Sequence, residues 1–205
     1  MRHTRGAAYL SAATAYGWQA VTTDRTVTIS GIDRLHAAFD TNTYAARVEG
    51  GYRFVVPSIG GVGVTPYAAV QSTTFDLPSY AESVLSGSNA FALAYAGKVY
   101  TDVRSELGLR SDKSFALADG MLTLRSRLGW AHDFDPTSSI GATFQALAGA
   151  SFVVNGAAQA HDAALVTAVV EKAWRNGWTT AATFEGEFSQ VTRSYAGKGV
   201  VRYQW

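Results

Sequence analysis

The sequence contains no cysteine, only 4 prolines, and little charge for a chain of 205 residues. The absence of cysteine excludes disulfide frameworks, thiolate metal sites and thiol nucleophiles. Charged residues make up 16% of the chain, whereas about 25% is usual in soluble domains. No 18-residue run is apolar enough for a spanning helix, because the longest uncharged stretches (6–23, 54–75 and 136–161) are rich in glycine, serine, threonine or proline.

The charges that are present nearly cancel. The 17 Lys and Arg residues oppose 16 Asp and Glu residues, which leaves a formal net charge of +1. Proteins that bind nucleic acid show a basic excess or a basic stripe. We therefore expect no nucleic-acid partner.

The N-terminus superficially resembles a secretion signal, since basic residues precede a run of small ones. The apolar core of that signal would be weak, because it is mainly alanine interrupted by Tyr9, Ser11 and Thr14. We interpret residues 6–20 as the first strand instead, preceded by a short tail at residues 1–5. An export signal is not expected within this chain.

Strict alternation of two residue classes recurs along the chain. In the segments 44–54, 98–110, 122–130, 178–188 and 198–205, every charged residue falls on one parity and most large apolar residues on the other. The charged residues of these segments are Arg47, Glu49, Arg53, Lys98, Asp102, Arg104, Glu106, Arg110, Arg125, Arg127, Glu185, Glu187, Lys198 and Arg202. Successive side chains of a strand point to opposite faces. The pattern predicts β-structure with one apolar and one charged face.

Eight strands are predicted, at residues 6–20, 38–55, 63–75, 97–111, 120–133, 162–175, 178–190 and 197–205. Short connections (56–62, 112–119 and 176–177) alternate with longer ones (21–37, 76–96, 134–161 and the modest 191–196). Asp119-Gly120 and Asn176-Gly177 are typical of type I′ hairpins, and Asn155-Gly156 indicates a further small hairpin within the longest loop. This arrangement predicts an antiparallel up-and-down meander.

Alternation alone fits a soluble sandwich, a soluble barrel or a membrane barrel. Most predicted strands reach 10 residues or more, longer than usual in globular proteins and close to the length that crosses a bilayer at a tilt. The charged face mixes both signs, so its side chains can pair across a hydrated lumen. We therefore predict an all-β, antiparallel, up-and-down transmembrane β-barrel with about eight strands in this chain.

The tryptophans favour the same choice. Each lies near the end of a predicted strand: Trp174, Trp178 and Trp205 on the side of the short turns, and Trp18 and Trp130 on the side of the long loops. Two aromatic belts that enclose an aliphatic band are typical of membrane–water interfaces. A soluble core would more often place tryptophan in mid-strand.

Six segments carry a family resemblance. They are TDRTVTISGIDR (23–34), GYRF (51–54), SELGLR (105–110), LTLRSRLGWAHDF (122–134), GASFVVNGA (149–157) and SYAGKGVVRYQW (194–205). In this order they extend over nearly the whole chain, which resembles the C-terminal β-barrel (translocator) domain of autotransporters. Autotransporters are the type V secretion proteins of Gram-negative outer membranes.

The resemblance implies a 12-stranded barrel that anchors the protein in the outer membrane and takes part in exporting an N-terminal passenger, with help from the barrel-assembly machinery. Counted back from Trp205, this chain supplies the last eight strands. We therefore expect one partial domain over residues 1–205, with the passenger, the pore-spanning helix and the first four strands absent. The implied partners are outer-membrane lipid, the assembly machinery and, where a longer chain exists, a passenger in cis.

The C-terminal strand carries the most informative motif. Val201, Tyr203 and Trp205 place apolar residues at alternate positions before a final aromatic residue, as outer-membrane barrels commonly do. By resemblance, these three residues form the signal that the assembly machinery reads. The alternative is an ordinary lipid-facing strand that ends in an interfacial aromatic residue.

No enzymatic chemistry is expected. The charges of the polar face are interpreted as a structural salt-bridge network, and the scattered histidines (His3, His36, His132 and His161) have no metal-ligand spacing. A nucleophile elbow and nucleotide-binding glycine patterns are absent. We predict no catalytic residue, metal or cofactor. The alternatives to a translocator are a small stand-alone structural or pore-like outer-membrane barrel and a soluble β-sheet binding module.

Overall fold

The computed structural model describes residues 1–29, 31–147, 149–157 and 159–205. The described chain consists of β-strands and one short 3-10 helix, η1 (Pro57–Ile59). Among these residues, no helix has the length and apolar character needed to cross a membrane.

All eight predicted strands are present. They are β2 (Ala8–Val27), β3 (Asp33–Tyr52), β5 (Val62–Leu77), β9 (Lys98–Leu117), β10 (Gly120–Asp133), β13 (Asp162–Trp174), β14 (Trp178–Phe188) and β15 (Arg193–Tyr203). Each strand in this order pairs antiparallel with the next. At the margins, β1 (Arg2–Arg5), within the predicted tail, pairs with β2, and β4 (Phe54–Val56) pairs with β5. The prediction of an all-β, antiparallel, up-and-down fold is confirmed.

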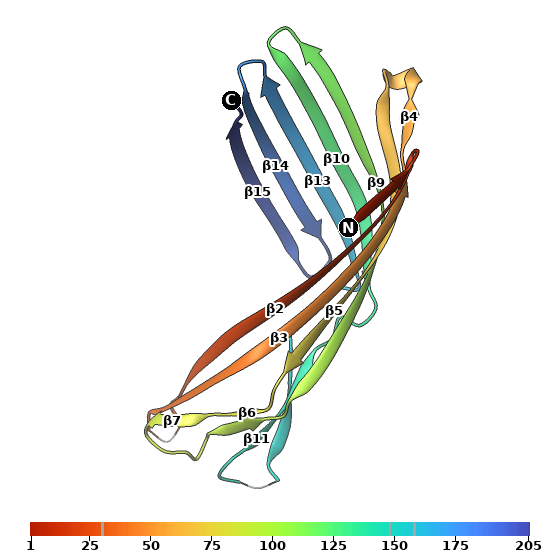
Figure 1. The fold of residues 1–205 in the computed structure, drawn as a ribbon. Coiled ribbons are helices and arrows are strands. Elements are labelled where there is room, and N and C mark those ends of the chain that lie inside the picture. Colours follow the sequence, from red (N-terminus) through yellow and green to blue (C-terminus); the bar gives the residue numbers. More distant parts are fainter. Residues whose placement is uncertain (30, 148, 158) are drawn as a thin grey trace.

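The main sheet is strongly curled. Figure 1 shows β2 and β3 running at a steep angle to β13, β14 and β15, so the sheet wraps part of the way around an axis. In the part of the chain that the structure describes, β1 and β2 at one edge are not paired with β15 at the other. The sheet is therefore a half-barrel, and β15 is exposed along its whole length.

On the side of the long loops, β2 and β3 extend much further than predicted. The loop expected at residues 21–37 is much shorter, because β2 and β3 continue to pair as a ribbon as far as Val27 and Asp33. The side chains there are largely polar, so the alternation of apolar residues ends before the backbone pairing does. The polarity of the side chains reflects the surroundings of each face of the sheet. The backbone hydrogen bonds between two strands do not require either face to be apolar.

Two expected long loops contain further strands. Residues 76–96 include β6 (Tyr80–Ala81), β7 (Ser83–Ser86) and β8 (Leu93–Tyr95), and residues 134–161 include β11 (Ser139–Phe144) and β12 (Ser151–Asn155). A second sheet has the order β12-β11-β8-β6, while β7 pairs with β3. The expected small hairpin is β11–β12, in which β11 ends at Phe144 and β12 begins at Ser151. Asn155 is the last residue of β12, so the predicted Asn155-Gly156 turn is wrong.

Two short turns differ from the prediction. β9 continues to Leu117, six residues past its predicted end, so the connection expected at residues 112–119 is much shorter. The β9–β10 connection contains only Ala118 and Asp119, and Gly120 already belongs to β10. The β13–β14 connection contains three residues, and its last residue, Gly177, has φ +87°. A three-residue hairpin with glycine in the left-handed region is a common alternative to the two-residue type I′ turn.

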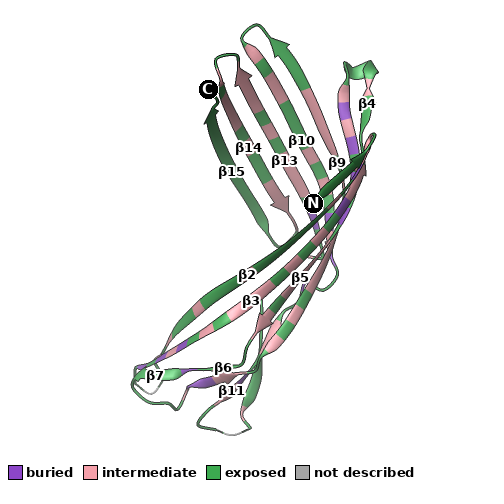
Figure 2. Cartoon of the chain, in the orientation of Figure 1, coloured by how far each residue is buried: buried purple, intermediate pink, exposed green. Residues whose placement is uncertain are grey.

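The fold has little conventional core. Figure 2 shows that most of the ribbon is exposed or intermediate. Leu35 is the largest side chain that is fully buried among the described residues, and many large apolar side chains of the main sheet are exposed. Such extensive apolar exposure indicates that one face of the sheet is built to contact something other than water.

Candidate functional site

The pairing register sorts the strand residues onto two faces, because residues directly opposite each other share a face. Leu109 lies opposite Leu128, which in turn lies opposite Val166, and this mainly apolar parity forms what we call the outer face. The other parity forms the inner face. Thirteen of the fourteen predicted charges lie on the inner face of strands. The fourteenth, Arg53, follows β3 and pairs with Asp112 of that face.

The outer face has a continuous apolar middle. Exposed aliphatic and aromatic side chains occupy it from β3 to β14, including Val48, Val70, Leu107, Leu109, Leu124, Leu128, Val170 and Phe184. Charged side chains on this face lie toward its ends, with Lys113 and Lys172 near the short turns and Asp40 and Asp76 near the long loops.

The predicted tryptophans are distributed at several levels of the sheet. Trp174 ends β13, Trp178 begins β14, and Trp205 follows β15. Trp130 lies near the loop-side end of β10, whereas Trp18 lies in the middle of β2 because this strand continues past its predicted end. Next to Trp18, the outer face changes from apolar residues to the polar ribbon.

The predicted C-terminal motif lies on the outer face at the free edge. Tyr203 is opposite Trp178, with ring centroids 4.9 Å apart. Val201 and Trp205 share its parity, and all three motif side chains are exposed.

The centre of the inner face is an ion-pair network. Arg110 contacts both carboxylate oxygens of Glu49, with nitrogen–oxygen distances of 2.6 and 2.8 Å. Arg47 donates to Glu49 at 3.0 Å and to Glu106 at 2.9 Å. Both carboxylates are buried, and each is bridged by more than one arginine. Burial of a charge is tolerated when it is paired and hydrogen-bonded in this way.

Tyr67 joins the two halves of this network. Its hydroxyl group donates to Glu106 and accepts from Nε of Arg127 at 2.7 Å, while Arg127 also pairs with Glu106. The guanidinium carbon of Arg110 lies 4.3 Å from the centroid of the Tyr67 ring. Tyr67 was not predicted as a site residue. Its place on the inner face follows from the parity of β5, but its role depends on contacts between strands.

Glycines make room for this ring. A Cβ atom at Gly108 would lie 2.6 Å from both the Tyr67 hydroxyl oxygen and the Leu128 carbonyl oxygen, and one at Gly129 would lie 2.9 Å from the same hydroxyl. Tyr67 therefore lies flat across β9 and β10 where both strands lack side chains. Glycine inside a strand commonly marks such a close approach.

Tyr9 is a second unpredicted member of the network. Its hydroxyl group donates to Glu49 at 2.9 Å and accepts from Arg110 at 2.8 Å. A Cβ atom at Gly51, directly opposite in β3, would lie 2.6 Å from the Tyr9 ring. Tyr9 and Tyr67 thus use the same arrangement, an inner-face tyrosine over a strand glycine.

Comparison with known proteins assigns this architecture to a family. A family model described as "Autotransporter beta-domain" matches residues 1–185. This chain belongs to the autotransporter β-domain family. The chain is also similar to a protein of Serratia marcescens named "Extracellular serine protease", with 25% identity over 185 residues. The match covers 90% of this chain but 17% of the Serratia protein, so this β-domain spans less than a fifth of that relative.

The remaining charges of the β-domain lie around the central network. Toward the long loops, Arg104 contacts Glu187 at 2.7 Å and Asp133 at 3.7 Å. Toward the short turns, Arg53 pairs with Asp112 at 2.6 Å, and Arg125 lies 3.3 Å from Glu171. Three predicted residues on the inner face of β14 and β15 form no ion pair with any described residue: Glu185, Lys198 and Arg202.

Three histidines of the β-domain contact oxygen atoms of aspartate residues. His36 lies 2.8 Å from Asp24, and His132 lies 2.9 Å from Asp162. His161 contacts the Asp133 carbonyl oxygen at 2.9 Å. Within the described ranges, no group of three His, Asp or Glu side chains is placed to hold a metal ion.

Proposed function

We propose that this chain is the outer-membrane translocator and anchor of an autotransporter, and that it takes part in surface export of an N-terminal passenger. The observation that carries the proposal is the match of the autotransporter β-domain family over residues 1–185. The sheet supports it independently, because an outer face with an apolar middle and a charged inner face suit a barrel wall between lipid and water.

The height of the apolar outer face fits this role. Tyr44 and Tyr52 lie eight positions apart on the outer face of β3, which is about 26 Å along the strand. At the tilt of about 35–45° found in outer-membrane barrels, this length rises about 20 Å across the membrane. The apolar band of outer-membrane barrels is about 25 Å tall and is flanked by aromatic girdles. We propose that Trp18 and Trp130 lie in one girdle and that Trp174, Trp178 and Trp205 lie in the other, with outer-membrane lipid between them.

We propose a structural rather than catalytic role for the inner-face charges. Glu49 and Glu106 each accept hydrogen bonds from two arginines and a tyrosine. Carboxylates held in this way are poor general bases, because protonation would break several charge-assisted hydrogen bonds. The protease activity in the Serratia protein's name belongs to a chain of which this match covers 17%.

We further propose that Val201, Tyr203 and Trp205 are the signal read by the barrel-assembly machinery. Support comes from their shared outer-face parity and their position at the C-terminal end of β15, which among the described residues pairs on one side with β14. A strand with unpaired backbone groups can be captured by strand addition.

Surface export is tested with a fusion in which a signal peptide, an epitope-tagged passenger, a pore-spanning helix and four autotransporter barrel strands precede Met1, expressed in a Gram-negative host. We expect the chain in the outer-membrane fraction and the epitope cleaved by protease added to intact cells. A variant with Tyr203→Ser and Trp205→Ser should fail to reach the outer membrane, whereas Val191→Ser in the β14–β15 connection serves as the control. Recovery of the original chain as a detergent-independent soluble protein would refute the proposal.

The coding sequence upstream of Met1 separates the translocator from a stand-alone barrel. An in-frame extension that encodes four more alternating strands and a passenger supports the translocator. An intergenic gap with a promoter favours the small stand-alone barrel.

A further inference from the structure

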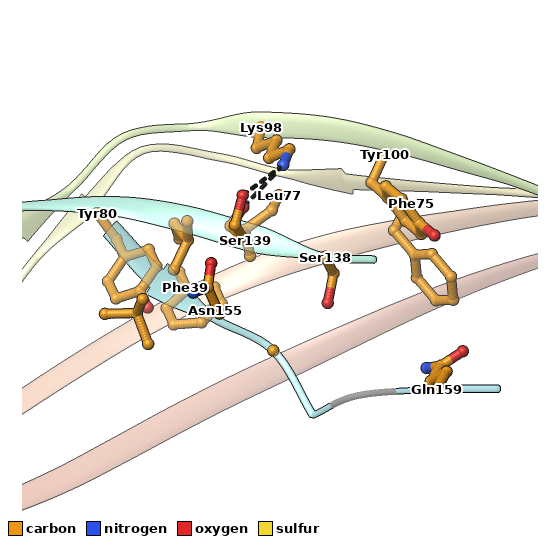
Figure 3. A pocket seen from close by; sticks show the side chains of 13 residues that line it. Phe39, Phe75, Leu77, Tyr80, Lys98, Tyr100, Ser138, Ser139, Asn155 and Gln159 are labelled. Carbon is orange, nitrogen blue, oxygen red and sulfur yellow. Dashed lines mark hydrogen bonds between the residues drawn. The ribbon is translucent and has the colours of Figure 1, made fainter. Parts of the chain in front are cut away.

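The second sheet packs against the inner face of the main sheet on the side of the long loops. The rings of Phe39 on β3 and Tyr80 on β6 are stacked with centroids 3.9 Å apart, and Tyr80 stacks on Tyr95 of β8 at 4.6 Å. A cavity of about 430 Å³ lies beside this contact. Its walls come from both sheets, as Figure 3 shows.

The cavity is predominantly apolar. Phe39, Phe75, Tyr80 and Tyr100 supply aromatic rings, while Leu77, Ile140 and Val154 supply aliphatic surface. In Figure 3, Phe75 and Tyr100 lie together at one end, and Phe39 and Tyr80 lie together at the other. Cavities of about 300–1,000 Å³ with such linings are typical of small-molecule sites.

Lys98 provides one cation in this apolar lining. Its Nζ atom donates to the Ser139 carbonyl oxygen at 2.8 Å and to the Ser139 hydroxyl oxygen at 3.2 Å. Both acceptors are neutral, and among the described residues no carboxylate pairs with Lys98. An ammonium group has three donors, so one N–H remains for a ligand. Every arginine at the centre of the inner face, by contrast, already contacts a carboxylate.

We propose that this cavity is a binding site for a small amphipathic monocarboxylate with an aromatic or short alkyl body. The body occupies the space between the two ring pairs, where burial of apolar surface favours binding. The carboxylate accepts a charge-assisted hydrogen bond from Lys98. The side-chain amide of Asn155, which also lines the cavity, offers a second donor. This site goes beyond passenger export and does not depend on it.

The probe is 2-naphthoate, titrated into the full 205-residue chain in detergent, with a protein-free detergent titration as the blank. Isothermal titration calorimetry should detect saturable binding. The neutral analogue 2-naphthalenemethanol should bind about tenfold more weakly, the factor expected for loss of one charge-assisted hydrogen bond.

Two variants divide the interaction into its parts. Lys98→Met keeps most of the side-chain length. It should reduce the affinity for 2-naphthoate about tenfold and leave the affinity for 2-naphthalenemethanol unchanged. Ile140→Trp should fill the cavity and abolish binding of both ligands. Lys113→Met, on the outer face near the short turns, is the matched control and should bind as the original chain does. Circular dichroism checks that each variant keeps its strand content.

Absence of saturable naphthoate binding above the blank would overturn the site. Equal naphthoate affinity in the original chain and Lys98→Met, or undiminished binding by Ile140→Trp, would also overturn it. Failure of surface export leaves all three results unaffected, so the two proposals are tested separately.

Discussion

Tyr67 contributes to stability through its packing as well as its hydroxyl group. The ring lies over two strands at once because Gly108 and Gly129 have no side chains, and this position brings its oxygen to Glu106 and Arg127. Buried carboxylates are costly unless several donors satisfy them. The ion-pair network therefore depends on Gly108 and Gly129, although neither residue takes part in it through a side chain.

Gly108→Ala tests this dependence. Its Cβ atom would meet the Leu128 carbonyl oxygen and the Tyr67 hydroxyl oxygen at 2.6 Å, and we expect a loss of about 1–3 kcal/mol in the free energy of unfolding, as for overpacked sites. Urea unfolding in detergent, followed by circular dichroism, measures the loss. Gly197→Ala is the control, because a Cβ atom there has no neighbour within 4 Å. Equal effects at the two glycines would disprove the close-packing account.

Neighbouring residues of β10 test, at the residue scale, whether the outer face of the sheet contacts lipid. Leu124 on the outer face is 39% exposed, and if it faces lipid near the midplane, Leu124→Arg should cost about 2–4 kcal/mol. Phe184→Arg on β14 should behave in the same way. Arg125→Leu should be milder, because it removes an exposed contact to Glu171. Unfolding in lipid vesicles measures the difference, and equal tolerance at Leu124 and Arg125 would contradict the assignment.

At the scale of elements, one short turn contacts the neighbouring hairpin. Asp119 in the β9–β10 turn accepts a hydrogen bond from Lys172 of β13 at 2.5 Å. This hydrogen bond lowers the pKa of Asp119 below its usual value. The interaction therefore joins a turn to a strand of the next hairpin.

The lowered pKa gives a pH dependence with a definite sign. Because folding lowers the pKa of Asp119, its contribution to stability is present above the unfolded pKa of about 3.9 and is lost as the pH falls through the folded value. Unfolding measured between pH 6 and pH 2, conditions we choose to bracket that range, should show a smaller acid-induced loss in Lys172→Met than in the original chain. Identical pH profiles would show that the contact is not maintained in solution.

At the scale of the whole molecule, the open sheet leaves two edges with unpaired backbone groups. Such groups are costly in lipid, so a membrane barrel must close or pair its edges. Central strands such as β9 and β10 have neighbours on both sides, whereas within the described ranges β15 pairs with β14 alone. Backbone amides of β9 and β10 should therefore be better protected from hydrogen exchange than those of β15.

Amide hydrogen exchange on the chain in detergent measures this difference. We expect slow exchange in β9 and β10, and rapid exchange along the free side of β15 and in β1. The β14–β13 pairing serves as an internal reference, because each of these strands has two neighbours. Protection of β15 equal to that of β10 would show that the two edges find partners in solution.

The sequence by itself determined the class of fold, the eight long strands, the antiparallel order and the parity that carries the charges. Successive side chains of a strand point to opposite faces because of the local backbone geometry. These features can therefore be predicted from short segments of sequence. Arg47, Glu49, Glu106, Arg110 and Arg127 were identified as charges of one face for this reason.

Only the tertiary structure decided which of these charges meet. Arg110 reaches Glu49 across β5, which requires the curl of the sheet and its register, and Tyr67 requires glycines on two neighbouring strands. The second sheet also joins segments far apart in the chain, through pairs such as Phe144 with Leu93. Its strands are too short for alternation to predict them, and their pairing depends on contacts that arise only when the main sheet brings the two connections together.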